Sequence, residues 1–123
     1  MKLSTAVVID DDPFSVRVLD AALRRYHFNL VPTSRAGGIS GLLEVYRPGL
    51  LLFDATMPGL DAAGLVRFLR KSPALASTTV LLYAARTEAT LMRDVSGCGA
   101  DGFVVKSRDI TALATSLGHF LLR

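Results

Sequence analysis

The 123-residue sequence is poor in the residues that small proteins use for cross-links. Its single cysteine cannot close an internal disulfide, and its two histidines and one cysteine are too few for a zinc site. It contains no run of about 20 apolar residues, which excludes a membrane-spanning helix, and the short apolar run before Asp10 is no secretory signal. These absences predict a cytoplasmic domain that does not bind a membrane.

Half of the residues, 50%, are hydrophobic and 20% are charged, a balance typical of folded domains. A chain of this length buries roughly two-thirds of its surface, so we expect one domain over residues 1–123 with a core that needs no cross-links. The net charge is +3, but the basic residues form no run and no stripe interleaved with aromatics. We therefore expect no direct binding to nucleic acid.

Five short apolar segments alternate with five longer segments in which apolar residues recur at helical spacing. Four of the short segments are continuous apolar runs, typical of parallel strands buried on both faces, and the fifth ends in proline and suits an edge strand. The alternation predicts an α/β fold, a doubly wound five-stranded parallel sheet of order 2-1-3-4-5 with helices on both faces. The predicted strands are Thr5–Ile9, Phe28–Pro32, Gly49–Phe53, Thr79–Tyr83 and Gly102–Val105, and the predicted helices cover residues 13–26, 36–46, 63–71, 88–96 and 109–122.

Charged residues follow three of the predicted strands. Asp10 and Asp11 follow the first strand, Asp54 the third and Lys106 the fifth. Because ligands of such sheets bind beyond the carboxyl ends of the strands, where the strand order reverses, we expect these side chains to converge. Three neighbouring carboxylates repel one another unless a cation is present, and oxygen donors without histidine or cysteine favour Mg²⁺ or Mn²⁺. Lys106 could then hold an anion that joins the metal.

Three segments of the chain carry a resemblance to a known family. They are Asp10-Asp11 after the first strand, Asp54–Pro58 after the third, and Gly99–Lys106 around the fifth. With these segments at this spacing, the chain resembles the receiver domain of bacterial response regulators over nearly its whole length. The resemblance implies a flavodoxin-like fold and a role in two-component signal transduction.

The resemblance also implies roles for the residues of the acidic cluster. Asp54 would accept a phosphoryl group from a histidine kinase or a histidine phosphotransfer protein. Asp11, Asp54 and the backbone carbonyl of Thr56 would bind Mg²⁺, with Asp10 acting mainly through a water, and Lys106 would pair with a phosphoryl oxygen. Such a domain is a signalling domain, not an enzyme, and at most catalyses the acceptance and loss of its own phosphoryl group.

The sequence departs from the family pattern at the end of the fourth strand. The family usually carries threonine or serine there, whereas this chain has Ala84. The missing hydroxyl would donate a hydrogen bond to a phosphoryl oxygen, a charge-assisted interaction worth about 1.5–3 kcal/mol. In the family this hydroxyl also couples phosphorylation to an aromatic residue of the fifth strand, here Phe103. We therefore predict that Phe103 lies inward regardless of phosphorylation and that the output face is uncoupled or permanently set.

A second departure follows the lysine. The family usually has proline there, joined by a cis peptide bond, whereas this chain has Ser107. Because a cis bond before a non-proline residue costs about 2.5–4 kcal/mol, we predict a trans bond between Lys106 and Ser107.

The resemblance places the output surface on the fourth helix, fifth strand and fifth helix, where a downstream protein or a second copy of the chain would bind. The candidate contact residues are Arg86, Met92, Arg93, Arg108, Ala112 and Leu113. The alternative is a pseudo-receiver, a protein-interaction module that acts without phosphorylation. The four retained charged residues favour the phosphorylated form of signalling, and Ala84 favours the alternative.

Two other readings of the acidic residues are weaker. A phosphatase of the haloacid dehalogenase type needs a second aspartate two positions after its nucleophile, where Thr56 stands. A flavodoxin-like FMN carrier would place phosphate where Asp10 and its neighbours would repel it. We interpret two further acids, Asp12 and Asp61, as helix N-caps.

Overall fold

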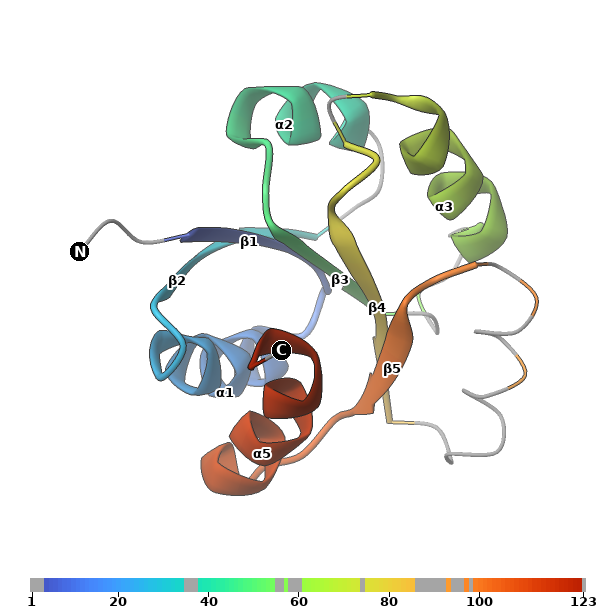
Figure 1. Cartoon of the computed structure of the whole chain (residues 1–123). Coiled ribbons are helices and arrows are strands. Elements are labelled where there is room, and N and C mark those ends of the chain that lie inside the picture. Colours follow the sequence, from blue (N-terminus) through green and yellow to red (C-terminus); the bar gives the residue numbers. More distant parts are fainter. Residues whose placement is uncertain are drawn as a thin grey trace.

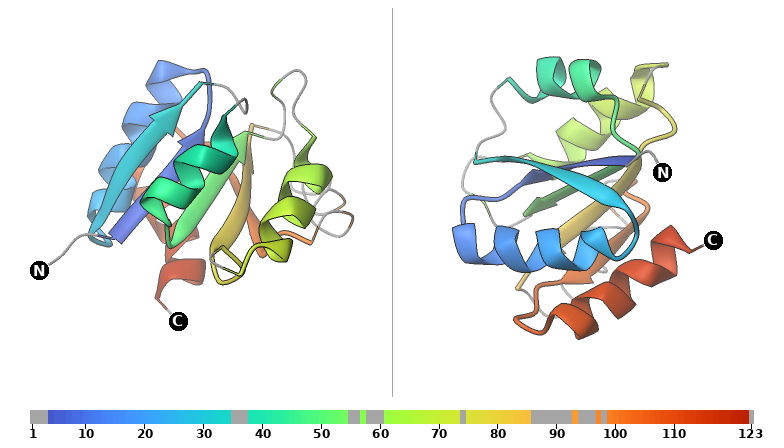
Figure 2. Two further views of the ribbon diagram at one scale, coloured as in Figure 1. Left: turned by 90° about the horizontal axis from the view of Figure 1, so that it is seen from above. Right: turned by 90° about the vertical axis from the view of Figure 1, so that its left-hand side faces the viewer.

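The structure, a computed structural model, describes residues 4–34, 38–54, 57, 61–73, 75–85, 93, 97 and 99–122. Five parallel strands form one sheet, with α2 and α3 on one face and α1 and α5 on the other (Figure 1). Figure 2 shows the same three layers from two further directions. The strands are β1 (Ser4–Ile9), β2 (Phe28–Thr33), β3 (Leu50–Asp54), β4 (Thr79–Ala84) and β5 (Gly102–Val105), and the helices are α1 (Pro13–Arg24), α2 (Ile39–Tyr46), α3 (Ala62–Lys71) and α5 (Ile110–Leu121).

The strand order is β2-β1-β3-β4-β5, which confirms the predicted topology. β2 is an edge strand, as predicted from its proline: Pro32 pairs with Val8 of β1 on one side, and none of the described strands pairs with β2 on the other. The order reverses between β1 and β3, whose carboxyl ends lie side by side with Ile9 opposite Phe53. This reversal brings the residues after both strands to one place at the edge of the sheet.

Each face of the sheet is covered by its own hydrophobic cluster. On β1, Ala6 and Val8 pack with α1 and α5, whereas Val7 and Ile9 pack with α2 and α3. Side chains of a strand alternate between faces, so a strand covered on both sides must be apolar at every position. This is the reason that the strands are continuous apolar runs in the sequence.

Aspartates begin three of the helices. Asp12 accepts a hydrogen bond from the Phe14 N–H at α1, and Asp61 accepts one from the Gly64 N–H at α3, which confirms both predicted caps. Asp109 caps α5 in the same way. None of the helices that the structure describes is both long and apolar enough to cross a bilayer.

Two predicted helices differ from the structure or lie beyond it. The helix predicted over 36–46 begins at Ile39, because Gly38 before it has a φ of 80°, a left-handed conformation outside the helical range. The helix predicted over 88–96 falls, apart from residue 93, on residues outside the described part of the chain.

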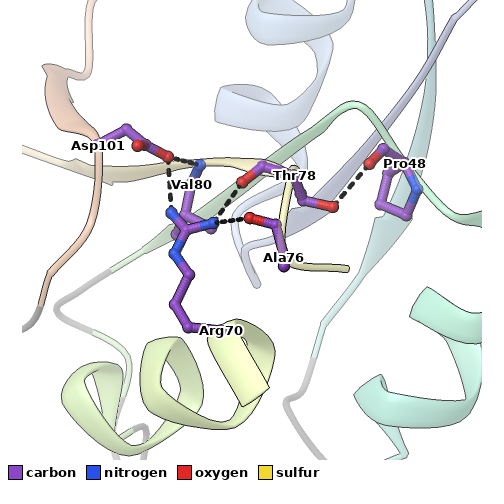
Figure 3. A network of polar contacts seen from close by, with 6 residues as sticks. All are labelled: Pro48, Arg70, Ala76, Thr78, Val80 and Asp101. Carbon is purple, nitrogen blue, oxygen red and sulfur yellow. Dashed lines mark hydrogen bonds and ion pairs between the residues drawn. The ribbon is translucent and has the colours of Figure 1, made fainter. Parts of the chain in front are cut away.

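A polar network joins α3 to the starts of β4 and β5 at the end of the sheet opposite the acidic residues (Figure 3). Arg70 donates to two backbone carbonyls ahead of β4, that of Thr78 at 2.8 Å among them, and to Asp101 Oδ2 at 2.8 Å. The same carboxylate oxygen accepts the Val80 N–H at 2.8 Å, and the Thr78 hydroxyl donates to the Pro48 carbonyl at 2.9 Å. The network provides hydrogen-bond partners for backbone groups at the start of β4, and it fixes α3 against the sheet.

We expect Asp101→Ala to lower the free energy of unfolding by about 1–3 kcal/mol, because the Val80 N–H and the Arg70 guanidinium both lose their charged acceptor. Urea denaturation followed by circular dichroism measures the change. Arg67→Ala, an exposed change on the same helix, is the control and should stay within about 0.5 kcal/mol. An equally small change in Asp101→Ala would show that the network does not stabilise the fold.

Candidate functional site

Three carboxylates meet at the carboxyl edge of the sheet. Asp10 and Asp11 follow β1 directly, and Asp54 is the last residue of β3. One oxygen from each of the three carboxylates lies within 4.8 Å of the others. The backbone fixes this arrangement, because the Asp10 N–H donates to the Thr33 carbonyl at 3.0 Å and β1 pairs with β3 up to Ile9 and Phe53. The predicted convergence of the three acids is therefore present in the structure.

Lys106 completes the cluster from β5. Its N–H donates to the Ala84 carbonyl at 2.9 Å, which extends the β4–β5 pairing by one residue. Its Nζ donates to Asp54 Oδ2 at 3.0 Å and forms an ion pair with Asp10 Oδ2, also at 3.0 Å. The ammonium thus lies between two carboxylates that are 3% and 5% exposed as residues.

Burial and the neighbouring carboxylates shift the pKa of the Lys106 ammonium in opposite directions. Burial alone lowers its pKa, but the contacts with Asp54 and Asp10 outweigh burial and raise the pKa above its ordinary value. Lys106 is therefore positively charged at neutral pH. One cation faces three carboxylates here, and this leaves the cluster with an excess of negative charge.

The donor set of the cluster fits a divalent cation. Asp10 Oδ2 is buried and accepts no hydrogen bond from the described residues, although it lies 3.0 Å from Lys106 Nζ. Asp11 is exposed at the mouth of the cluster and can reach a ligand from solvent. Carboxylate oxygens alone suit hard cations such as Mg²⁺ and Mn²⁺. Thr56, whose carbonyl is the remaining predicted ligand, lies outside the described residues.

Asp12 does not belong to the cluster, because it is turned to the helix. Its carboxylate accepts hydrogen bonds from the Ser15 hydroxyl and the Phe14 N–H, and these two bonds lower its pKa. Asp10, two positions earlier, is turned to the cluster instead: its Oδ1 accepts the Asp12 N–H at 3.0 Å, and its Oδ2 faces Lys106.

Two cavities open beside the cluster. One, of about 350 Å³, is lined by Asp10 and Asp11 together with apolar residues of α1 and the end of β2. The other, of about 300 Å³, is lined by Asp12, Lys106 and Arg108 among others. The first gives a reagent in solution access to the carboxylates of Asp10 and Asp11, and the second gives access to the Lys106 side chain.

The two predicted switch residues lie on β4 and β5. Ala84 is completely buried and packs in the cluster with α2 and α3, and as an alanine it lacks the hydroxyl that the family carries there. Phe103 is half-buried and packs against the same cluster. Its ring therefore contacts the core in this form of the chain, while the predicted uncoupling from phosphorylation stays a prediction.

The peptide bond between Lys106 and Ser107 is trans, as predicted, because the described residues contain no cis peptide bond. The Ser107 hydroxyl accepts the Asp109 N–H at 3.0 Å, and this bond shapes the turn that leads into α5.

The prediction that Leu113 contacts a partner at the output surface is wrong. Leu113 is 1% exposed and packs in the cluster between the sheet and α1, so it cannot reach a partner. Its neighbour Ala112 is exposed, since successive helical residues point about 100° apart. Arg93 and Arg108 are exposed as well, whereas Arg86 and Met92 lie outside the described residues.

Two contacts near the cluster were not predicted from the sequence. The Lys106 ammonium lies 5.3 Å from the ring centroid of Tyr83, and the Arg108 guanidinium lies 5.6 Å from that of Phe14. Periodicity indicated only that Tyr83 is a buried strand residue. The signal that could have found the first contact is strand alternation, which puts Tyr83, Val104 and Lys106 on one face once the β4–β5 register is known.

A doubly wound parallel sheet of this strand order, with an acidic cluster and a lysine at its carboxyl edge, defines a domain of the flavodoxin-like fold class. The chain belongs to the family of response regulator receiver domains, whose model matches residues 6–117. Such domains belong to two-component signalling.

The chain is also similar to individual proteins, in sequence to the first of those that follow and in fold to the other two. The chain is 32% identical over 104 residues to the transcriptional activator protein ExaE of Pseudomonas putida, covering 82% of this chain and 47% of that protein. The chemotaxis response regulator CheY4 of Vibrio cholerae superposes with a TM-score of 0.82 at 17% identity, covering 98% of this chain and all of that one. The receiver domain of sensor histidine kinase PA1611 from Pseudomonas aeruginosa, with a magnesium ion in its active site cleft, gives 0.78 at 16% identity over 98% and 99% of the two chains.

The chain spans about half the length of the curated relatives that it matches. Several of these carry names of transcription regulators, such as the DNA-binding transcriptional activator EvgA of Escherichia coli.

Proposed function

We propose that Asp54 accepts a phosphoryl group from a histidine kinase or a histidine phosphotransfer protein. The observation that carries the proposal is the position of the Lys106 ammonium, 3.0 Å from both Asp54 and Asp10, beside a third carboxylate. Such an ammonium can stabilise negative charge on an incoming phosphoryl oxygen as soon as that oxygen takes the place of one of its carboxylate partners.

The transfer needs little covalent chemistry from the protein. An oxygen of the Asp54 carboxylate forms a bond to phosphorus while the bond from phosphorus to the donor's imidazole nitrogen breaks. The electron pair of the broken bond stays on that nitrogen, and the product is an acyl phosphate on Asp54. Lys106 lies on the same carboxylate and offsets the charge that builds up on the phosphoryl group.

Asp10, Asp11 and Asp54, with the carbonyl of Thr56, would hold Mg²⁺, which when bound neutralises charge on the phosphoryl oxygens. The excess of carboxylates over cations in the cluster supports this assignment. So does the relative from Pseudomonas aeruginosa, which holds magnesium in the corresponding kind of cleft.

The test is incubation of the protein with acetyl phosphate and Mg²⁺, followed by intact-mass measurement. A mass gain of one phosphoryl group, which disappears when the acyl phosphate is cleaved by hydroxylamine, is the expected result. No gain under conditions that phosphorylate a known receiver domain would overturn the proposal.

A pseudo-receiver that binds its partner without phosphorylation is the second candidate, because Ala84 lacks the hydroxyl that bonds a phosphoryl oxygen. It predicts no mass gain, and partner binding that Asp54→Ala leaves unchanged.

The matched relatives are named as transcription regulators, and we propose that the output partner is an effector protein or a second copy of the chain. It would bind to the face formed by the predicted fourth helix, β5 and α5, with Arg93, Arg108 and Ala112 as exposed candidates beside Arg86 and Met92.

Mg²⁺ is expected to stabilise the fold, because the ion binds the native acidic cluster and not the unfolded chain. At 100 times its Kd the ion should add about 2.7 kcal/mol to the free energy of unfolding. Asp11→Asn removes one ligand and should weaken Mg²⁺ binding by calorimetry at least about tenfold. Asp20→Asn, an acid of α1 paired with Arg24, is the control and should bind as the original chain does. Equal binding by Asp11→Asn would remove Asp11 from the site.

A further inference from the structure

Tyr83 lies directly beneath the ammonium of Lys106. It is completely buried on β4 and packs in the hydrophobic cluster between the sheet and the helices α1 and α5. Tyr83 pairs with Val104 of β5, and Lys106 follows two residues later on the same face of the sheet. The centroid of its ring is 5.3 Å from Lys106 Nζ, within the range of a cation–π interaction.

The hydroxyl of Tyr83 sets this residue apart from an ordinary core aromatic. It is buried and has no hydrogen-bond partner among the described residues, an arrangement that costs stability. Burial, and then the charges of Asp10, Asp12 and Asp54, raise the pKa of the hydroxyl. The phenol is therefore neutral at any physiological pH, and it interacts with the ammonium through its ring rather than as a charged partner.

The ammonium of Lys106 is held from two sides by carboxylates and from another by this ring. Asp54 and Asp10 each lie 3.0 Å from Nζ, and Asp11, in the same acidic cluster, is a further carboxylate toward which a flexible lysine side chain can turn. The face of an aromatic ring attracts a cation without offering a hydrogen bond that would turn it away from the carboxylates. The ring therefore adds an attraction that favours the position of the ammonium between Asp10 and Asp54.

The neighbouring residue cannot make this contact. Ala84 packs on the opposite face of the sheet, in the cluster with α2 and α3, and carries no hydroxyl. Strand β4 therefore contributes to the site through the ring of Tyr83, not through the usual hydroxyl of its last residue.

We propose that Tyr83 is a positioning residue: its ring holds the Lys106 ammonium between Asp10 and Asp54 and thereby sets the rate of phosphoryl acceptance. The second half of this proposal rests on the proposed function, because it requires Asp54 to be phosphorylated. The first half concerns the protein without a phosphoryl group and is tested separately.

The first measurement is the NMR signal of the Lys106 Hε protons in the free protein. Protons near the face of a ring are shifted upfield, so the unmodified chain and Tyr83→Phe should both show the shift and a nuclear Overhauser contact with the ring. Tyr83→Leu and the longer Tyr83→Met should lose the shift. If the unmodified chain shows neither shift nor contact, the proposal is overturned, and this result needs no variant to fold.

The second measurement is the initial rate of mass gain with acetyl phosphate and Mg²⁺. Tyr83→Leu and Tyr83→Met should slow the mass gain about fivefold, whereas Tyr83→Phe, which keeps the ring, should gain mass at the rate of the unmodified chain. Tyr26→Leu removes another tyrosine of the same cluster, whose hydroxyl bonds the Ala114 carbonyl away from Lys106. This control should lose stability but keep the rate and the lysine signal.

The outcomes separate the two proposals. If neither the unmodified chain nor any variant gains a phosphoryl group, the proposed function fails. The NMR signal of Lys106 still decides whether the ring positions the ammonium. If Tyr83→Leu keeps the original rate, or if Tyr83→Phe slows as much as Tyr83→Leu, the ring does not set the rate and the positioning role is wrong.

Discussion

Replacing Asp54 with asparagine is expected to abolish the gain of a phosphoryl group from acetyl phosphate in the intact-mass experiment. The amide cannot form the bond to phosphorus that a carboxylate oxygen forms, and it cannot carry the charge that attracts the Lys106 ammonium. The change keeps the size of the side chain at a position that is 5% exposed, so the packing of β3 should be retained. The expected product is unmodified protein at every time point.

The control for this experiment is a loss of negative charge elsewhere. Asp61→Asn removes the same charge from the N-cap of α3, and it should gain the phosphoryl group at the original rate. A gain in Asp54→Asn equal to that of the unmodified chain would mean that another residue accepts the group. It would also show that the position of Lys106 beside Asp54 has a purely structural role.

Adding a hydroxyl at the end of β4 is expected to speed phosphoryl acceptance. In Ala84→Ser the new hydroxyl can donate to a phosphoryl oxygen, and a hydrogen bond to a charged group is worth about 1.5–3 kcal/mol. If the bond forms fully in the transition state, the rate rises about 10- to 150-fold. Initial rates of mass gain at fixed acetyl phosphate and Mg²⁺ measure the effect.

The same substitution should make the unphosphorylated protein less stable. Ala84 is completely buried in the apolar cluster with α2 and α3, so a serine hydroxyl without a partner costs about 1–3 kcal/mol. Ala84→Cys adds a side chain of similar size whose thiol is a weak donor, and it should keep the original rate. If Ala84→Cys is as fast as Ala84→Ser, the effect comes from volume and not from the hydrogen bond.

The sheet and the acidic cluster could be predicted because both depend on strong local patterns. Strands covered on both faces must be apolar at every position, and the runs before Asp10 and Asp54 meet this requirement. Once the strands are parallel, with a weak strand at the edge, few orders remain, and residues after β1, β3 and β5 must share one edge. The charged residues there, Asp10, Asp54 and Lys106, follow from the topology without any knowledge of side-chain conformation.

The output surface shows where this reasoning fails. Ala112 and Leu113 are neighbours near the start of α5, and both were predicted to face a partner. Only the packing of α5 against α1 and the sheet fixes the rotation of the helix, and that rotation turns Leu113 into the core and leaves Ala112 outside. Helical periodicity gives the spacing of the apolar residues, but a mostly apolar helix leaves its rotation undetermined.

By itself the sequence determined which residues become strands, how the strands are ordered and which charges gather at the edge of the sheet. The pattern of apolar residues identifies the strands, and the short connections between them leave few possible strand orders. Only the tertiary structure decided how those charges are paired. The ammonium of Lys106 lies midway between Asp10 and Asp54 and over the ring of Tyr83 because the register of β4 and β5 brings these groups together. Contacts between residues this far apart in the chain depend on distances of a few ångströms, which no pattern in the sequence specifies.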